Sequence, residues 1–188
     1  LLGRGSNVLV SDQGLRGVVI CLGGELAQIK GPGSGLQSPV PNPQSLYAGA
    51  GAALDEVATF AEEQGLAGAE FLAGIPGTVG GGLHSNAGAF GRSLGDIVAG
   101  ITVLDRDGKE SVLNGTLIRR EYRRPMFDDG LVAVEVKLEF AEGPRSTVQG
   151  RMSAAQIREQ RWAKHPTEPS VGSFFRNPEK DGERIPAG

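Results

Sequence analysis

One stretch of 22 residues, 70–91, constrains this chain more than any other. It contains seven glycines and one charged side chain, yet Phe71, Ile75 and Leu83 are spaced through it and favour burial. A flexible linker would instead be polar and rich in serine. Because glycine lets backbone N–H groups approach a ligand closely, an apolar glycine-rich loop suits a nucleotide pyrophosphate. The alternative interpretation is a set of tightly packed turns that binds no ligand.

Composition favours a nucleotide-handling protein over several other classes. Glycine accounts for 30 of 188 residues without the three-residue period of a collagen-like fibre. The net charge of −3 argues against a nucleic-acid partner, which would require a basic stripe. The single cysteine, Cys21, lies in an apolar run and is expected to be buried. One cysteine and two distant histidines offer no disulfide framework and no Cys/His metal site, so no metal is expected.

The sequence also suggests where the protein works. It shows no signal peptide and no apolar segment near 18 residues, which predicts a cytoplasmic protein without a membrane partner. The chain begins without Met and stops at Gly188 without a closing element. We therefore expect a fragment that lacks both termini of a longer protein.

Hydrophobic spacing predicts the main elements. An amphipathic helix is expected over 53–64, closed by Gly65, and a second over 146–163, with Trp162 on its apolar face and Pro166 after its end. The Pro/Gly/Ser-rich residues 31–45 predict an irregular excursion. The expected strands are one that begins at 8–10, a buried one at 17–22, a hairpin pair at 101–104 and 110–113, and a long half-buried one at 131–140.

Five motifs occur in order along the chain. They read Gly3-Arg-Gly-Ser-Asn7; Gly74-Ile-Pro-Gly-Thr-Val-Gly-Gly81 with Asn86-Ala-Gly-Ala-Phe-Gly91; Tyr122-Arg-Arg-Pro-Met-Phe127; Arg161-Trp-Ala-Lys-His-Pro166; and Gly172-Ser-Phe-Phe-Arg-Asn-Pro178. Together they resemble the bacterial UDP-N-acetylenolpyruvoylglucosamine reductase family (UDP-N-acetylmuramate dehydrogenase, MurB). Three positions depart from the family pattern: Gly82 replaces Ala, Phe90 replaces Tyr, and Pro125 replaces Ser.

The resemblance implies the fold and the cofactor. The fold would be α+β, a PCMH-type FAD-binding fold of two α/β subdomains at about 1–45 and 46–143. Residues 144–188 would form a connecting helix and the start of a substrate domain. FAD would be non-covalent, because the first motif lacks the His through which some relatives attach it. The implied cofactor-binding residues are Gly3, Gly5, Ser6, Asn7, Gly74, Ile75, Pro76, Gly77, Thr78, Gly80, Gly81, Asn86, Gly88 and Ala89.

The resemblance also implies an NADPH-dependent oxidoreductase that reduces UDP-N-acetylglucosamine enolpyruvate to UDP-N-acetylmuramate in peptidoglycan synthesis. Arg123 would stabilise negative charge on the substrate carboxylate, and Ser173 would donate a proton to the substrate carbon. The implied substrate contacts are Tyr122, Lys164 and Asn177. Without the resemblance, a solvated arginine and an ordinary turn serine are the simpler interpretations. The family's further catalytic Glu, near its C-terminus, has no counterpart among residues 1–188.

Two other functions stay open. The chain could be a flavin- or nucleotide-binding module without turnover, or another oxidoreductase of the same FAD superfamily. The expected partners are small molecules, a UDP-sugar and NADPH, and no obligate protein partner is evident.

Overall fold

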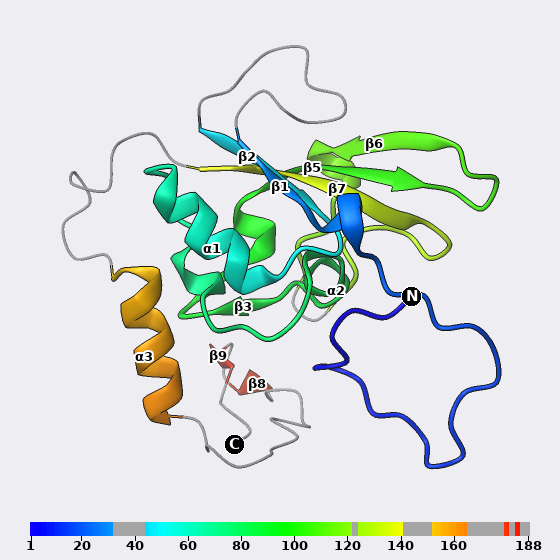
Figure 1. Ribbon diagram of the computed structural model, residues 1–188, viewed down its shortest axis with the longest axis horizontal. Coiled ribbons are helices and arrows are strands. Elements are labelled where there is room, and N and C mark those ends of the chain that lie inside the picture. Colours follow the sequence, from blue (N-terminus) through cyan, green and yellow to red (C-terminus); the bar gives the residue numbers. More distant parts are fainter. Residues whose placement is uncertain (32–43, 122–123, 141–151, 165–178, 181–182, 185–188) are drawn as a thin grey trace.

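The computed structural model describes residues 1–31, 44–121, 124–140 and 152–164, together with the backbone of two short strands near the C-terminus. An antiparallel sheet with the strand order β1-β2-β7-β5-β6 forms its centre (Figure 1). The strands are β1 (Ile29–Lys30), β2 (Ser45–Gly49), β5 (Val98–Leu104), β6 (Glu110–Asn114) and β7 (Val132–Glu139).

One face of the sheet builds the core. Leu46 lies opposite Leu138, and Val136 lies opposite both Ala48 and Ile101. All five side chains are 0% exposed. Alternate residues of a strand point to the same face, so the pairing collects these apolar groups into one layer. Burial of each large side chain contributes about 1.5–3 kcal/mol of transfer free energy.

The α-helices lie on the same side of the sheet in Figure 1. They are α1 (Leu54–Glu63), α2 (Val79–Ser85) and α3 (Ala154–Lys164). Short 3₁₀ turns and two small hairpins complete the described elements. These are η1 (Gly24–Ala27), η2 (Glu70–Leu72), η3 (Leu94–Asp96), η4 (Gly115–Leu117), β3 (Gly88–Ala89) with β4 (Arg92–Ser93), and β8 (Glu179–Lys180) with β9 (Glu183–Arg184). The mixture of helices with an antiparallel sheet confirms the predicted α+β class.

Three predicted elements are confirmed. Helix α1 buries the expected face, Leu54, Val57, Ala58 and Ala61, and Gly65 follows it with φ +72°. Strands β5 and β6 form the predicted hairpin, and β7 is the predicted long strand. In the hairpin turn, Asp105 Oδ1 accepts hydrogen bonds from the N–H groups of residues 107 and 109, both at 2.9 Å. The Asp-Gly signal therefore acts through a side chain that caps the turn.

The predictions for the N-terminal segment are wrong. Residues 8–10 and 17–22 form no strand, and Cys21 is exposed. In Figure 1 residues 1–23 form a wide loop that extends away from the sheet. Val18 is 84% exposed and Leu9 is 82% exposed. An apolar run becomes a strand only when a neighbouring strand pairs with it, and the described part of the chain places none beside this segment.

The second helix is shorter than its predicted range. Residues 146–151 lie outside the described part, and α3 begins at Ala154 because Ser153 and Gln156 form a capping box. The backbone N–H of Ser153 donates to Gln156 Oε1 at 2.8 Å, and Ser153 Oγ accepts from the N–H of Gln156 at 3.1 Å. Trp162, predicted on the apolar face, is 70% exposed. Among the described residues, no helix has both the length and the apolar character needed to span a membrane.

Candidate functional site

The first two predicted phosphate loops meet in the structure, although 70 positions separate them in the sequence. Ser6 Oγ donates a hydrogen bond to the carbonyl of Pro76 at 2.7 Å. A Cβ atom at Gly3 would lie 2.6 Å from Thr78 Oγ1, so only glycine permits this approach. Gly77 has φ +145°, and a Cβ there would lie 3.4 Å from Ser6 Oγ. We call residues 3–7 and 76–78 the cradle.

The glycines after the cradle lie in a helix, not in an open loop. Thr78 caps α2, and its Oγ1 accepts a hydrogen bond from the N–H of Gly81 at 3.3 Å. The N–H groups of Val79 and Gly80 donate to the carbonyls of residues 52 and 50, at 2.8 and 2.7 Å. Several donors expected to face a ligand are thus used within the protein. For this part of the stretch, the interpretation as packed turns explains the glycines.

Close packing accounts for Gly80 and Gly82 in α2. A Cβ at Gly80 would lie 3.1 Å from the carbonyl oxygen of Ala50, and one at Gly82 would lie 2.6 Å from Leu94 Cδ1. Gly81 is exposed on the same helix, and a Cβ there would make only an ordinary contact at 3.5 Å. Gly81 is therefore the member of the triplet that stays accessible beside the cradle.

The last part of the predicted motif is a tight hairpin. Gly88 pairs with Ser93 and Ala89 with Arg92, which leaves Phe90 and Gly91 as the two turn residues. Both turn residues have positive φ, 53° and 73°, as a type I′ turn requires. A Cβ at Gly88 would lie 2.2 Å from the carbonyl oxygen of Arg92. The structure thus uses Gly88 to bring two backbones together.

Asn86 links the glycine-rich stretch to the segment before the predicted catalytic arginine. It ends α2 in the left-handed conformation, with φ 45°, and is 8% exposed. Its Oδ1 accepts from the N–H of Gly95 at 3.0 Å, and its Nδ2 donates to the carbonyls of Arg120 and Glu121 at 3.1 and 3.3 Å. The side chain that was expected to contact the cofactor therefore fixes the two residues that precede Tyr122.

Arg120 is a residue that the sequence analysis did not single out. Its Nε donates to the carbonyl of Gly95 at 2.9 Å. Its two terminal nitrogens donate to the carbonyls of residues 115, 118 and 98, each at 3.1 Å. These bonds hold η3, η4 and β5 together beside Asn86. The local cluster of basic residues at 119–124 was the available signal, but composition does not show which arginine bonds to the backbone.

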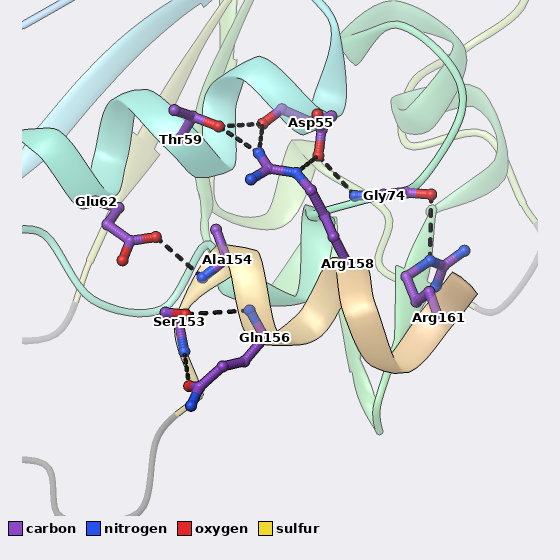
Figure 2. Close-up of polar contacts among 9 residues, drawn as sticks. All are labelled: Asp55, Thr59, Glu62, Gly74, Ser153, Ala154, Gln156, Arg158 and Arg161. Carbon is purple, nitrogen blue, oxygen red and sulfur yellow. Dashed lines mark hydrogen bonds and ion pairs between the residues drawn. The ribbon is translucent and has the colours of Figure 1, made fainter. Parts of the chain in front are cut away.

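Helix α3 contacts the glycine-rich stretch at Gly74. Figure 2 shows Arg158 pointing to Asp55 of α1 and Arg161 pointing to Gly74. Asp55 Oδ1 accepts hydrogen bonds from Arg158 Nε at 2.6 Å and from the N–H of Gly74 at 2.7 Å. Lys164, predicted to contact substrate, is exposed at the end of the same helix.

The electrostatics of this contact follow from its hydrogen bonds. Burial opposes the charged form of Asp55, but the hydrogen bonds from Arg158 and Gly74 and the charges of Arg158 and Arg4 outweigh it. The pKa of Asp55 is therefore lowered, and the carboxylate is ionised at neutral pH. Burial lowers the pKa of Arg161, although a guanidinium stays protonated under ordinary conditions.

The remaining predicted residues divide into two groups. Within the cradle, Gly5, Asn7 and Pro76 are exposed, and Ile75 is half-buried beside it. Tyr122, Arg123, Ser173 and Asn177 lie outside the described residues.

Comparisons with known proteins can now be set against this geometry. The FAD binding domain family matches residues 1–114, which is more than half of the chain. The chain belongs to this family of FAD-binding domains. The cradle formed by residues of the first two motifs lies within the matched range.

Similar proteins carry a more specific name. The UDP-N-acetylenolpyruvoylglucosamine reductase of Agathobacter rectalis is 37% identical over 183 residues, which cover 95% of this chain and 58% of that protein. The one from Methylococcus capsulatus is 40% identical over 181 residues, which cover 96% of this chain and 56% of that protein. This chain thus spans a little over half the length of these relatives. The predicted resemblance to that reductase family is confirmed.

A solved structure agrees with the sequence relatives. The crystal structure of UDP-N-acetylenolpyruvylglucosamine reductase (MurB) from Thermus caldophilus matches with a TM-score of 0.71 and 29% identity. The match covers 93% of this chain and 59% of that chain. The predicted FAD-binding fold is therefore confirmed.

Proposed function

We propose that the protein to which this chain belongs reduces UDP-N-acetylglucosamine enolpyruvate to UDP-N-acetylmuramate, with FAD as its cofactor and NADPH as its electron donor. The observation that carries the proposal is the contact between the two glycine motifs, where Ser6 Oγ bonds to Pro76 and Gly3 lies against Thr78. The names of the sequence and structural relatives support the same reaction.

The residues at the cradle fit an anionic cofactor. Gly3 and Gly77 have no side chain at the point where the two loops of the cradle approach each other. The hydroxyl groups of Ser6 and Thr78 lie at this same point. A pyrophosphate favours such close backbone and hydroxyl groups. When bound, FAD would supply the hydride chemistry that links NADPH to the enolpyruvyl double bond. The chain would contribute binding, orientation and a proton.

The substrate side of the site is part of the same proposal. Arg123 would stabilise charge on the substrate carboxylate, and Ser173 would supply the proton that completes the lactyl ether. Tyr122, Lys164 and Asn177 would bind the UDP-sugar. The bonds from Asn86 to the carbonyls of residues 120 and 121 support a fixed position for the start of this catalytic segment. Without the arginine charge, we expect the reaction to slow by about a hundredfold or more.

The proposal also includes the domain division and the location. We divide the chain into an FAD-binding part, residues 1–143, with subdomains at about 1–45 and 46–143, and a connecting and substrate-binding part, residues 144–188. We place the activity in the cytoplasm, without a membrane or nucleic-acid partner.

Anaerobic absorbance spectroscopy of the purified 188-residue chain tests the proposal. The expected result is a yellow protein that NADPH bleaches and that the enolpyruvyl UDP-sugar re-oxidises. A yellow protein that the sugar does not re-oxidise would support a flavin-binding module without turnover and contradict activity in this chain. A folded, colourless protein that also fails to bind added FAD would overturn the cofactor assignment. Re-oxidation by other acceptors but not by the UDP-sugar would favour a different oxidoreductase.

A further inference from the structure

Four residues from three separate segments form a polar cluster around one peptide turn. Asp55 belongs to α1, Gly74 precedes the cradle, and Arg158 and Arg161 belong to α3 (Figure 2). Asp55 Oδ1 accepts the N–H of Gly74 at 2.7 Å, and Arg161 Nε donates to the carbonyl of Gly74 at 3.2 Å. We call these four residues the Gly74 clamp. It holds the donor and the acceptor of one residue from opposite sides.

The clamp fixes a turn that only glycine adopts easily. Gly74 has φ +70°, and a Cβ there would lie 3.1 Å from Arg161 Cδ. Arg158 is ordered in turn, because its Nε donates to Asp55 Oδ1 at 2.6 Å and its Nη2 donates to the carbonyl of Asp55 at 3.3 Å and to Thr59 Oγ1. The direction of the chain after Gly74 therefore depends on two side chains of α3.

The clamp is close in sequence to the cradle. Pro76, which accepts the Ser6 hydrogen bond, follows Gly74 by two residues, and Thr78 follows it by four. Such a short segment transmits a change in direction at Gly74 to the cradle. The clamp also contains two guanidinium groups and one carboxylate, so its excess positive charge favours an anion at the neighbouring cradle.

We propose that the Gly74 clamp positions the cradle for the FAD pyrophosphate, so that the affinity for FAD depends on the docking of α3. This inference rests on the proposed function, since it takes FAD as the ligand of the cradle. Asp55, Arg158 and Arg161 act here as positioning residues, because they act on the cradle through the turn at Gly74. The same helix carries Lys164, so a substrate that binds Lys164 and shifts α3 would change the affinity for FAD, and FAD would change the affinity for that substrate equally.

The experiment measures the FAD dissociation constant of the purified chain by quenching of flavin fluorescence. Arg161→Met retains the aliphatic stem but removes the donor to Gly74, and Arg158→Met removes the partner of Asp55. We expect each to raise the dissociation constant about tenfold, as for the loss of one charge-assisted hydrogen bond. Arg161→Lys retains a cationic donor and should recover part of the affinity.

Two control variants separate positioning from general destabilisation. Glu62→Gln changes another contact between α1 and α3, in which Glu62 Oε2 accepts the N–H of Ala154 at 2.9 Å. Ala154 is the first residue of α3, whereas Arg161, which contacts Gly74, lies near its other end. Lys137→Met removes an ion pair at 2.6 Å to Glu139 on β7. We expect both controls to bind FAD within about twofold of the parent. Urea unfolding of each cofactor-free variant shows whether it is folded.

The outcomes distinguish the two proposals. A parent chain that binds FAD, with folded arginine variants that bind it equally well, would overturn the clamp and leave the proposed function intact. Equal weakening in Lys137→Met, which lies outside the contact between α1 and α3, would also overturn it, because the effect would then be general. A folded parent chain that binds no FAD would overturn the proposed function and the clamp together. If Arg158→Met does not fold, the FAD affinities of Arg161→Met and Arg161→Lys still test whether the clamp positions the cradle.

Discussion

Two regions of this chain share a composition and differ in structure. Residues 1–24 and 70–91 are both apolar and rich in glycine, and each contains a predicted phosphate loop. In the second region Leu72, Val79 and Leu83 are 0% exposed, whereas Leu9 and Val18 of the first are 82% and 84% exposed. The apolar residues of the two regions are alike, so composition does not explain the difference. What differs is the number of neighbouring elements that each region contacts.

The second region is enclosed by the rest of the fold. It lies between α1, the sheet and α3, and hydrogen bonds fix its turns at Gly74, Thr78 and Asn86. The first region contacts the body through the cradle and, at its C-terminal end, through residues 22–28, which lie against Gly49 at the end of β2 and against Gly51. A glycine-rich stretch is thus ordered by its surroundings and not by its own sequence.

The largest effect should come from removing a buried side chain in the second region. Leu83→Ala, in α2, should lower the free energy of unfolding by about 2–5 kcal/mol, because it removes buried methyl groups and leaves a cavity. Val18→Ala, in the first region, should change it by less than about 0.5 kcal/mol. Urea unfolding monitored by circular dichroism measures both. Equal losses for the two variants would show that residues 17–22 are buried and that the comparison is wrong.

The contact between the N-terminal segment and the sheet can be broken separately. A Cβ at Gly49 would lie 2.1 Å from the carbonyl oxygen of Leu26, so the backbone of residues 22–28 must move in Gly49→Ala. We expect a loss of about 1–3 kcal/mol and faster amide hydrogen exchange at residue 49, whose N–H donates to Gln28. Gly31→Ala is the control, because its Cβ would approach no closer than 4.0 Å to another residue. A tolerated Gly49→Ala would contradict this close approach.

The same comparison shows how much the sequence could predict. Helix α1, the hairpin around Asp105 and strand β7 were predictable because each is specified locally, by periodicity or by a turn signal. The failure at 17–22 has a physical cause, since hydrophobicity indicates that a segment favours burial but not what would cover it. The start of α3 had a local signal in Ser153 and Gln156 that the periodicity argument did not use.

The sequence indicated which residues of the candidate site belong together, but not the bonds that hold them. The resemblance to a known family assigned Gly3, Ser6 and Gly77 to one cofactor site, and the structure brings these residues together. The motifs did not reveal that Asn86 bonds to backbone groups or that Arg120 binds four carbonyls. Such bonds join residues far apart in sequence, and a single sequence holds no signal for them.

Asn86 tests whether the second region is ordered by these distant bonds. Asn86→Gly keeps the left-handed backbone and removes three hydrogen bonds, so we expect a loss of about 1–3 kcal/mol in the free energy of unfolding. Asn86→Ala should lose roughly 1 kcal/mol more, because alanine is strained at φ 45°. Thermal and urea unfolding of both variants measure the contribution of the hydrogen bonds and the cost of the backbone strain. If both variants matched the parent, local packing alone would order the region.

Asp55 tests the contribution of charge to the same region. Asp55→Asn still accepts the N–H of Gly74 but loses the ion pair with Arg158, and we expect a loss of up to about 1 kcal/mol at neutral pH. Because the pKa of Asp55 is lowered in the folded chain, this contribution is present above the ordinary carboxyl value of 3.8 and lost as pH falls through the lowered pKa. The difference in unfolding free energy between parent and variant should therefore be constant from about pH 5 to 8 and disappear in stronger acid. If the difference in unfolding free energy persisted in stronger acid, the shape of the Asp55 side chain and not its charge would be responsible.

The smallest change in stability should come from Gly81→Ala, which we expect to stabilise the chain slightly and to weaken its binding of FAD. Gly81 lies in the first turn of α2, exposed beside the cradle, and a Cβ there would make only an ordinary contact at 3.5 Å with Thr78 Oγ1. Gly81→Ala should stabilise the cofactor-free chain by about 0.5 kcal/mol, because alanine loses less backbone entropy on entering a helix. In the proposed function the FAD pyrophosphate binds beside this surface, which the added methyl group would occupy, so the dissociation constant for FAD should rise about tenfold. If Gly81 were glycine only for packing, as Gly82 is, the substitution would leave the affinity for FAD unchanged. A variant that is more stable and binds FAD as well as the parent would therefore show that the exposed face of α2 lies outside the cofactor site.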